Sequence, residues 1–194
     1  MKRFVLFAVA LGLIASAFAP TTARAQKPGP DTYYFELANG KIYWERVYEL
    51  PISQKDLAER IKATGAVTNV SQQPGVITCT IPMHPVRYEG AGIRPEYLDL
   101  ALTSASVSAK ATIRMEPWEQ QYRVTVRQMV LDMAKPSEAY PTLAGKHAFE
   151  YHFRHPMGVI RNTFYNTFLA NGVDFDFDRI FDVSRPGTDA MNKE

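Results

Sequence analysis

The fold is decided by residues 107–131, VSAKATIRMEPWEQQYRVTVRQMVL. In the first half polar residues alternate strictly with an apolar set, Val107, Ala109, Ala111, Ile113 and Met115. A period of two places alternate side chains on opposite faces of an extended strand, so one face of this strand is expected to be buried. The alternation stops at Pro117, which lacks a backbone donor, and resumes with Tyr122, Val124 and Val126. Two such runs joined by a short link predict an antiparallel hairpin.

The residues before this hairpin predict a second hairpin and a helix. Asn39-Gly40 separates two apolar runs and favours the positive φ values of a tight turn. Ser53 can cap a helix, with Asp56 placed three residues later to return a hydrogen bond, and this helix is expected to run to about Thr64. Short strands are then expected at 67–70 and 76–81.

The C-terminal third predicts a further helix over residues 158–170. Its apolar residues Ile160, Phe164 and Phe168 recur every four positions, and Asn171-Gly172 is expected to end it. Residues 173–183, rich in phenylalanine and aspartate, are expected to pack back on the body of the domain. Residues 97–106 are compatible with either helix or strand.

The first 25 residues have the pattern of a secretory signal peptide. A basic start precedes an apolar run over residues 4–18, and Ala23-Arg24-Ala25 supplies the small side chains that a cleavage site requires. We therefore expect export, cleavage after Ala25, and a periplasmic or secreted mature chain without a transmembrane span. It would comprise a flexible lead-in (26–31), a single α+β domain (32–184) and a disordered tail (185–194).

Removing this segment changes the charge balance of the chain. Three of the 22 basic residues and none of the 20 acidic ones precede the cleavage site, which leaves 19 basic against 20 acidic residues and a net charge of −1. A near-neutral chain has no general attraction to nucleic acid. The single cysteine, Cys79, cannot form an internal disulfide, and a buried position in a strand is its expected role.

Four basic residues fall on the polar face of the central hairpin. They are Lys110, Arg114, Arg123 and Arg127. A row of cations can bind an anionic ligand such as a glycan, a lipid head group or an acidic partner. The alternative is a charged strand face that is only solvated.

Histidines at positions 147, 152 and 155 are the candidate metal ligands. On a helix, His152 and His155 would share one face, from which imidazoles can bind zinc. Together with His147 and a nearby aspartate, they would form the site of a periplasmic metal-dependent hydrolase. However, Tyr151 and Phe153 alternate with the histidines as in a strand.

Asp174, Asp176 and Asp178 resemble the opening of a calcium-binding loop. Such a loop needs a glycine at its bend, where this chain has Arg179, and alternation with two phenylalanines fits an amphipathic segment equally well. The sequence contains no glycine-rich phosphate loop, no Gly-x-Ser-x-Gly elbow and no Cys-x-x-Cys pair. We therefore expect no cofactor.

Two segments carry a resemblance to a known family. The first is NGKIYWERVY over residues 39–48, followed by the helix that starts near Ser53, and the second is Tyr122-Arg123-Val124. Together they resemble a bacterial exported domain family of unknown function with a TATA-binding-protein-like fold. The family has Gly-Lys before the Tyr-Arg of its hairpin, whereas this chain has Gln120-Gln121. The resemblance covers about residues 39–132 and implies a curved antiparallel sheet with helices packed on one face; it carries over no site residues.

These observations favour a non-catalytic binding or structural module of the bacterial envelope. Its partner would be an anionic envelope ligand, or another envelope protein that binds an exposed sheet edge. Neither nucleic acid nor a cofactor is expected.

Overall fold

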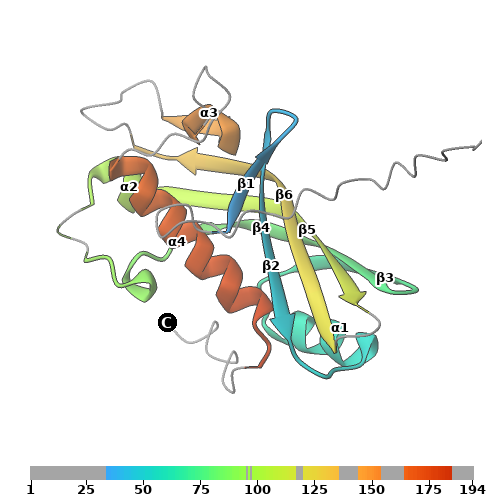
Figure 1. Cartoon of the computed structure of the whole chain (residues 1–194). Helices are drawn as coiled ribbons and strands as arrows, with labels where there is room; N and C mark the ends of the chain where they lie inside the picture. The colour runs from blue at the N-terminus through green and yellow to red at the C-terminus, as the bar shows by residue number, and fades with distance from the viewer. Residues whose placement is uncertain are drawn as a thin grey trace, which may run out of the picture.

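The computed structural model describes residues 34–94, 96, 98–116, 120–135, 144–153 and 164–184 (Figure 1). The predicted signal peptide, lead-in and tail lie outside these ranges, and so does His155. Within them the chain has the predicted α+β architecture, an antiparallel sheet with helices packed on one face. None of the described helices combines the length and apolarity that are needed to cross a bilayer.

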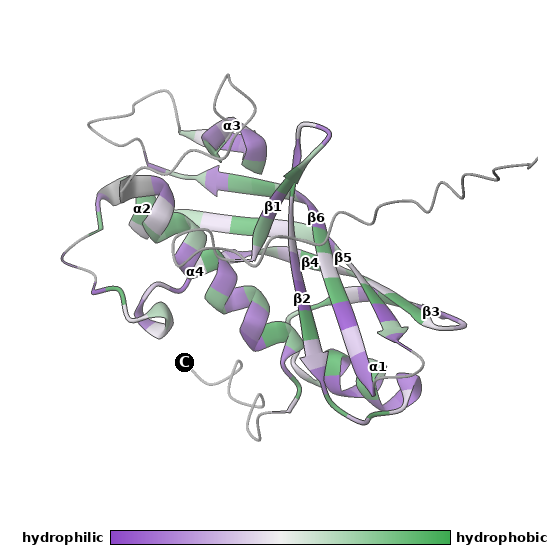
Figure 2. Ribbon diagram, in the orientation of Figure 1, coloured by the Kyte–Doolittle hydropathy of each residue, from purple (hydrophilic) through white to green (hydrophobic). Residues whose placement is uncertain are grey.

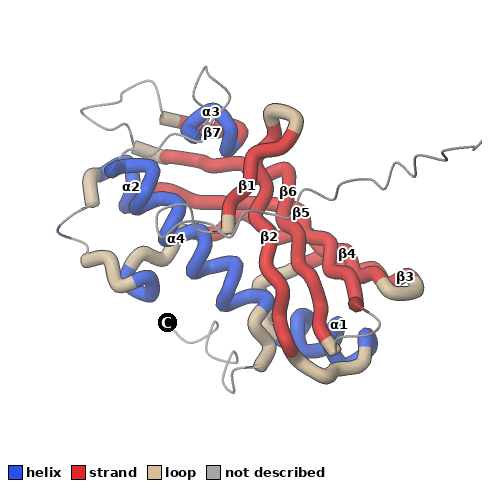
Figure 3. Tube along the Cα trace, viewed as in Figure 1, coloured by secondary structure: helices blue, strands red, loops and turns tan. Residues whose placement is uncertain are grey.

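The described strands form one seven-stranded sheet in the order β1-β2-β6-β5-β4-β3, with β7 paired to the far end of β6 (Figure 3). All neighbours are antiparallel. The strands are β1 (Phe35–Ala38), β2 (Lys41–Glu49), β3 (Thr68–Gln73), β4 (Val76–Pro85), β5 (Ala105–Glu116), β6 (Gln121–Met133) and β7 (Gly145–Ala148). The helices are α1 (Gln54–Ala63), the 3-10 turn η1 (Glu89–Ala91), α2 (Leu100–Thr103), α3 (Phe149–Phe153) and α4 (Phe164–Phe181).

The predicted central hairpin is confirmed as β5 and β6. Ala111 lies opposite Val126 and Ile113 lies opposite Val124, and all four side chains are buried. Hydrophobic and hydrophilic residues alternate along both strands, as Figure 2 shows. The period-two pattern therefore assigned one face of this hairpin to the core.

Helix α4 runs across the inner face of the sheet (Figure 1). The indole of Trp44 on β2 packs edge-on against Phe177, with ring centroids 5.6 Å apart. Tyr122 on β6 is fully buried and donates a hydrogen bond of 2.7 Å from its hydroxyl to the carbonyl of Phe181. The helix is thereby held over β2 and β6, and the other face of these strands is left to polar side chains.

The predicted turn and the predicted helix start are also confirmed. Asn39 and Gly40 have φ values of 52° and 72° and form the turn between β1 and β2. Ser53 caps α1, because its hydroxyl accepts a hydrogen bond of 3.1 Å from the amide of Asp56. Of the segment that fitted either helix or strand, Leu100–Thr103 is α2 and the residues from Ala105 onward begin β5.

The predicted end of the last helix at Asn171-Gly172 is wrong. Within the described residues α4 begins at Phe164 and continues through both positions to Phe181, so residues 173–181 are helical. Gly172 is instead a point of close approach, since a Cβ atom there would lie 2.6 Å from Cγ1 of Val86 and 3.0 Å from the ring of Tyr88. The absence of a side chain lets α4 lie against the segment that leads into η1.

We predict that Gly172→Ala lowers the free energy of unfolding, by about 1 to 3 kcal/mol, because the new methyl group overlaps the short, branched side chain of Val86. In an unobstructed helix the same change would stabilise the protein by about 1 kcal/mol. The half-buried neighbour Asn171 provides the control, and Asn171→Ala is expected to be neutral or slightly stabilising. Urea denaturation measures both, and a stabilised Gly172→Ala variant would contradict the packing argument.

Candidate functional site

The four predicted ligand-binding cations lie together on the open face of the sheet. Lys110 is directly opposite Arg127, and Arg114 is directly opposite Arg123. Directly opposed residues of an antiparallel pair share one face, and these four alternate with the buried residues that contact α4 and the core. We call these four residues the cation face.

The cations of this face differ in their partners. The guanidinium of Arg123 is 2.9 Å from a carboxylate oxygen of Glu45 and 3.1 Å from one of Glu116. The hydrogen bond to Glu116 and that to Glu45 raise the pKa of Arg123. Among the described residues none forms an ion pair with the exposed side chains of Lys110, Arg114 or Arg127. Three of the four cations are therefore free of carboxylate partners in the described part of the chain.

Beside Arg127 the sheet divides. Strand β6 pairs with β2 as far as Val126 and with β7 from Val130 onward, and no described strand pairs with residues 127–129 along this edge. The division coincides with a β-bulge, because two residues of β6 lie opposite Ala109 of β5 and Gln128 has a φ of 53°. A bulge bends its strand and breaks the ladder locally.

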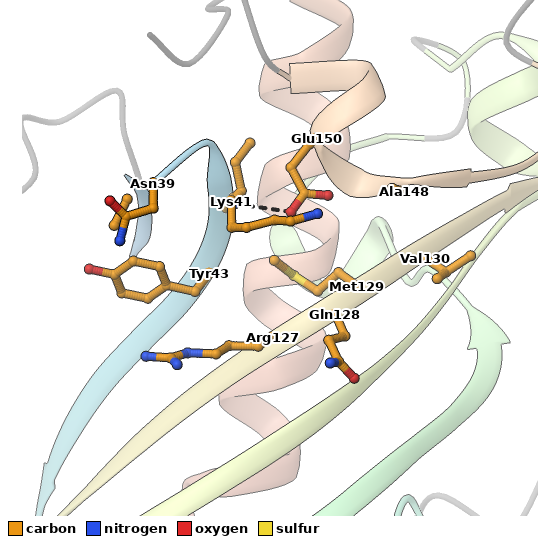
Figure 4. Close-up of a pocket in the computed structure, with 11 residues that line it drawn as sticks. Asn39, Lys41, Tyr43, Arg127, Gln128, Met129, Val130, Ala148 and Glu150 are labelled. Carbon is orange, nitrogen blue, oxygen red and sulfur yellow. Dashed lines mark hydrogen bonds between the residues drawn. The ribbon is translucent and has the colours of Figure 1, made fainter. Parts of the chain in front are cut away.

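A cleft of about 550 Å³ lies at this division (Figure 4). We call it the fork cleft. It is lined by β1, β2, β6, β7 and α3 through Ala38, Asn39, Lys41, Ile42, Tyr43, Arg127, Gln128, Met129, Val130, Ala148 and Glu150. Its volume falls within the range of about 300 to 1,000 Å³ that is usual for small-molecule sites.

The polar groups of the fork cleft are held by specific contacts. The guanidinium of Arg127 lies 5.6 Å from the ring centroid of Tyr43. The Tyr43 hydroxyl donates a hydrogen bond to Glu36, and partial burial together with this bond raises the pKa of Tyr43 to about 12. A carboxylate oxygen of Glu150 accepts a hydrogen bond of 3.2 Å from the amide of Ile42, which is the dashed line in Figure 4. Glu150 thus occupies the place of a strand partner on this edge of β2.

The chemistry of these groups fits the binding of an anion. The lining residues offer two cations, one carboxylate, two side-chain amides and an aromatic ring, but no histidine, serine or cysteine. A tyrosine whose pKa is about 12 and whose proton is engaged by Glu36 stays neutral near pH 7. The cleft can therefore hold an anion beside apolar surface.

The sequence indicates Arg127 as a binding residue but does not indicate the cleft that it borders. The sequence does contain a signal, because the alternation places position 128 inward, yet this position holds the polar residue Gln128 and Met129 follows it. In the structure Arg127 and Gln128 are both exposed and Met129 is buried. This change of phase is the sequence mark of a bulge. Lys41 and Tyr43 follow the Asn39-Gly40 turn, but nothing local to them indicates that they face β6.

The predicted metal ligands are only partly placed. His147 is in β7 and His152 in α3, with ring centroids 5.6 Å apart, and His155 lies outside the described residues. The expected strand alternation of Tyr151 to Phe153 is wrong, since these residues belong to α3. In the described ranges no group of three histidine, cysteine, aspartate or glutamate side chains is arranged to hold a metal ion.

The calcium-loop interpretation of the aspartates is wrong, because all three belong to helix α4. Asp174 accepts a hydrogen bond of 2.6 Å from the Trp44 indole, and burial raises its pKa. Asp176 accepts from the amide of Arg87 at 3.1 Å. Asp178 is 2.7 Å from the guanidinium of Arg46 and accepts from the Tyr48 hydroxyl at 2.9 Å. These carboxylates anchor the helix to the sheet and its loops.

Cys79 occupies the buried strand position that was predicted for it. It lies on β4 with 4% of its surface exposed, and burial raises the pKa of its thiol to about 12. A thiol that stays protonated and buried is a poor nucleophile. Cys79 is therefore a residue of the core.

Comparison with known proteins gives structural matches alone. No protein-family model matches the chain, and no curated protein sequence matches it. Matching solved structures include a TBP-like protein from Parabacteroides distasonis, at 13% identity and a TM-score of 0.45 over 78% of this chain and 97% of that one. They also include a DUF4468 family protein from Bacteroides ovatus, at 14% identity and a TM-score of 0.49 over 84% and 99% of the two chains. The TBP-like description is also that of the family named by the sequence resemblance.

We predict that His152 makes stability fall with decreasing pH. Burial and the neighbouring His147 lower the pKa of His152 from 6.5 to about 4, so between these values the unfolded chain binds a proton that the folded chain does not. The free energy of unfolding should therefore fall by about 2 to 3 kcal/mol between pH 7.5 and pH 4.5. Urea denaturation at pH 7.5 and 4.5 should show this loss reduced in His152→Leu and largely retained in the control His147→Gln. Equal pH dependence of wild type and His152→Leu would contradict it.

We also predict that Asp178 anchors α4. The variant Asp178→Ala removes the acceptor of Arg46 and Tyr48 at a largely buried position, and the free energy of unfolding is expected to fall by about 2 to 3 kcal/mol. Asp132→Ala is the control, since Asp132 is 3.8 Å from a well-exposed Lys146 and should contribute less than about 1 kcal/mol. Urea denaturation measures both variants. If Asp178→Ala lowers the free energy of unfolding by no more than the small amount expected for Asp132→Ala, the contacts of Asp178 do not anchor α4.

Proposed function

We propose that this protein is an exported, non-catalytic module that binds an anionic ligand of the bacterial envelope through its cation face. The leader pattern of residues 1–25 supports export to the periplasm or beyond. The position of the cations on a sheet face that no described helix covers supports a role in binding.

The observation that carries the proposal is the direct opposition of Lys110 and Arg127. Like charges at directly opposed positions of a sheet destabilise the pair. The same sheet supplies two carboxylates to Arg123 but none, among the described residues, to Lys110 or Arg127. An anion bound between these two side chains would offset their repulsion, so this repulsion favours the binding of an anion.

The charge pattern of the surrounding face favours a local anionic group over a long phosphate backbone. Glu45 and Glu116 lie beside Arg123, and Glu36 lies beside Tyr43 at the other end of the face. These carboxylates interrupt the positive surface that a nucleic acid would require along its length. A ligand that carries one or a few carboxylates or phosphates, or a flexible polyanion that presents a short run of them, would meet the cations without meeting these acids.

We predict that neutralising Lys110 and Arg127 removes polyanion binding. With poly-L-glutamate as the probe, wild type should bind with an affinity that falls as salt rises, and Lys110→Gln/Arg127→Gln should bind at least tenfold more weakly. The same double variant should be slightly more stable to urea, by about 0.2 to 1 kcal/mol, because a repulsive pair is lost.

The matched control is Lys55→Gln/Lys62→Gln, which removes two exposed cations from α1 and changes the net charge by the same amount. This control should retain the affinity of wild type. Equal weakening in both double variants would show that only net charge attracts the probe, and the proposal would then fail.

A further inference from the structure

The fork cleft has an apolar floor. Ala38 and Ala148 are exposed and Val130 is half-buried, and the buried side chains of Ile42 and Met129 complete the apolar lining. Apolar surface that borders a cleft of about 550 Å³ is stabilised when a hydrocarbon group covers it. A fully hydrated anion such as inorganic phosphate would leave this surface in contact with water.

The cations of the fork cleft exceed its acids. Arg127 and Lys41 both line it, and Lys110 lies directly across the ladder from Arg127. The one lining carboxylate, Glu150, is already engaged by the amide of Ile42. In Figure 4 Lys41 and Glu150 point toward one another, whereas Arg127 lies beneath Tyr43. The end of the cleft at Arg127 is therefore the end at which an anionic group meets a cation and no carboxylate of the lining.

The chain itself shows that a carboxylate can bind at this edge of the sheet. Because β2 and β6 separate here, the amide of Ile42 meets no described strand on the side away from β1, and Glu150 accepts its hydrogen bond from α3 at 3.2 Å. The Tyr43 hydroxyl donates its hydrogen bond to Glu36, so Tyr43 presents its ring to the cleft beside Arg127. The arrangement provides the Arg127 cation and the Tyr43 ring at one side and the apolar side chains of Val130 and Ala148 at the other (Figure 4).

From these features we propose that the fork cleft binds an anionic amphiphile. Its carboxylate or phosphate head is held by Arg127, and a short hydrocarbon chain lies along Val130 and Ala148, next to Met129. This inference rests on the proposed function and names its ligand class. The cation face attracts anions in general, and the cleft selects those that carry an apolar chain.

The test uses octanoate and octyl phosphate as probes, which present the two head groups on the same chain. Both should shift the methyl resonance of Met129 in protein labelled at its methionine methyl groups, and the tighter probe identifies the head group. Acetate and inorganic phosphate, which lack the chain, and octyl glucoside, which lacks the charge, should bind at least tenfold more weakly. If neither octyl anion shifts Met129, or if octyl glucoside binds equally well, the inference is overturned.

Two alanine-to-leucine substitutions distinguish binding in the cleft from binding elsewhere on the surface. Ala148 is exposed and lines the cleft, so Ala148→Leu should weaken octanoate and octyl phosphate at least tenfold while poly-L-glutamate binding stays unchanged. Ala63→Leu, at an exposed position near the end of α1, should leave all probes unaffected. Wild-type affinity of Ala148→Leu for the octyl anions would overturn the cleft assignment.

The probes also distinguish failure of this inference from failure of the proposed function. Binding of poly-L-glutamate without binding of the octyl anions would leave the cation face as a binding surface and overturn the cleft assignment alone. Binding of the octyl anions without poly-L-glutamate binding would support the cleft and restrict the proposed function to anions that carry a hydrocarbon chain.

Discussion

The antiparallel pairing of β5 with β6 is the constraint on which the other features of this protein depend. Its register directs Ala111, Ile113 and Val126 into the core and places Lys110 opposite Arg127 on the open face. The bulge at Gln128 shifts the alternation by one residue and bends β6 away from β2, so β7 becomes its neighbour beyond that point. The core, the cation face and the fork cleft therefore follow from one strand pairing.

Helix α4 packs on one face of the sheet, and the cation face lies on the other (Figure 1). Trp44 packs against Phe177 and Phe181 of this helix, and the carboxylates of Asp174 and Asp178 accept hydrogen bonds from groups of β2. Buried polar groups are stable only when they are paired, so these contacts restrict how the helix can lie on the sheet. Since the described helices pack on the inner face, the cations on the opposite face stay accessible.

Local signals were read correctly where a local cause decides the structure. Asn39-Gly40 makes a tight turn and Ser53 begins a helix because backbone preference and a neighbouring side chain suffice for each. Gly172 was misread as a helix end because its role depends on Val86 and Tyr88, which are distant in sequence. The short helix α3 was likewise misread as a strand, since alternation over three residues cannot separate the two.

The sequence by itself determined which side chains of the central hairpin face the core and which face solvent, because alternation is a property of the extended backbone. It thereby placed the four cations on one face. Only the tertiary structure decided that Arg123 is neutralised, since Glu45 comes from β2 and meets it through strand pairing. The same holds for the cleft beside Arg127, because the point at which two strands separate depends on which distant segments pair with each of them.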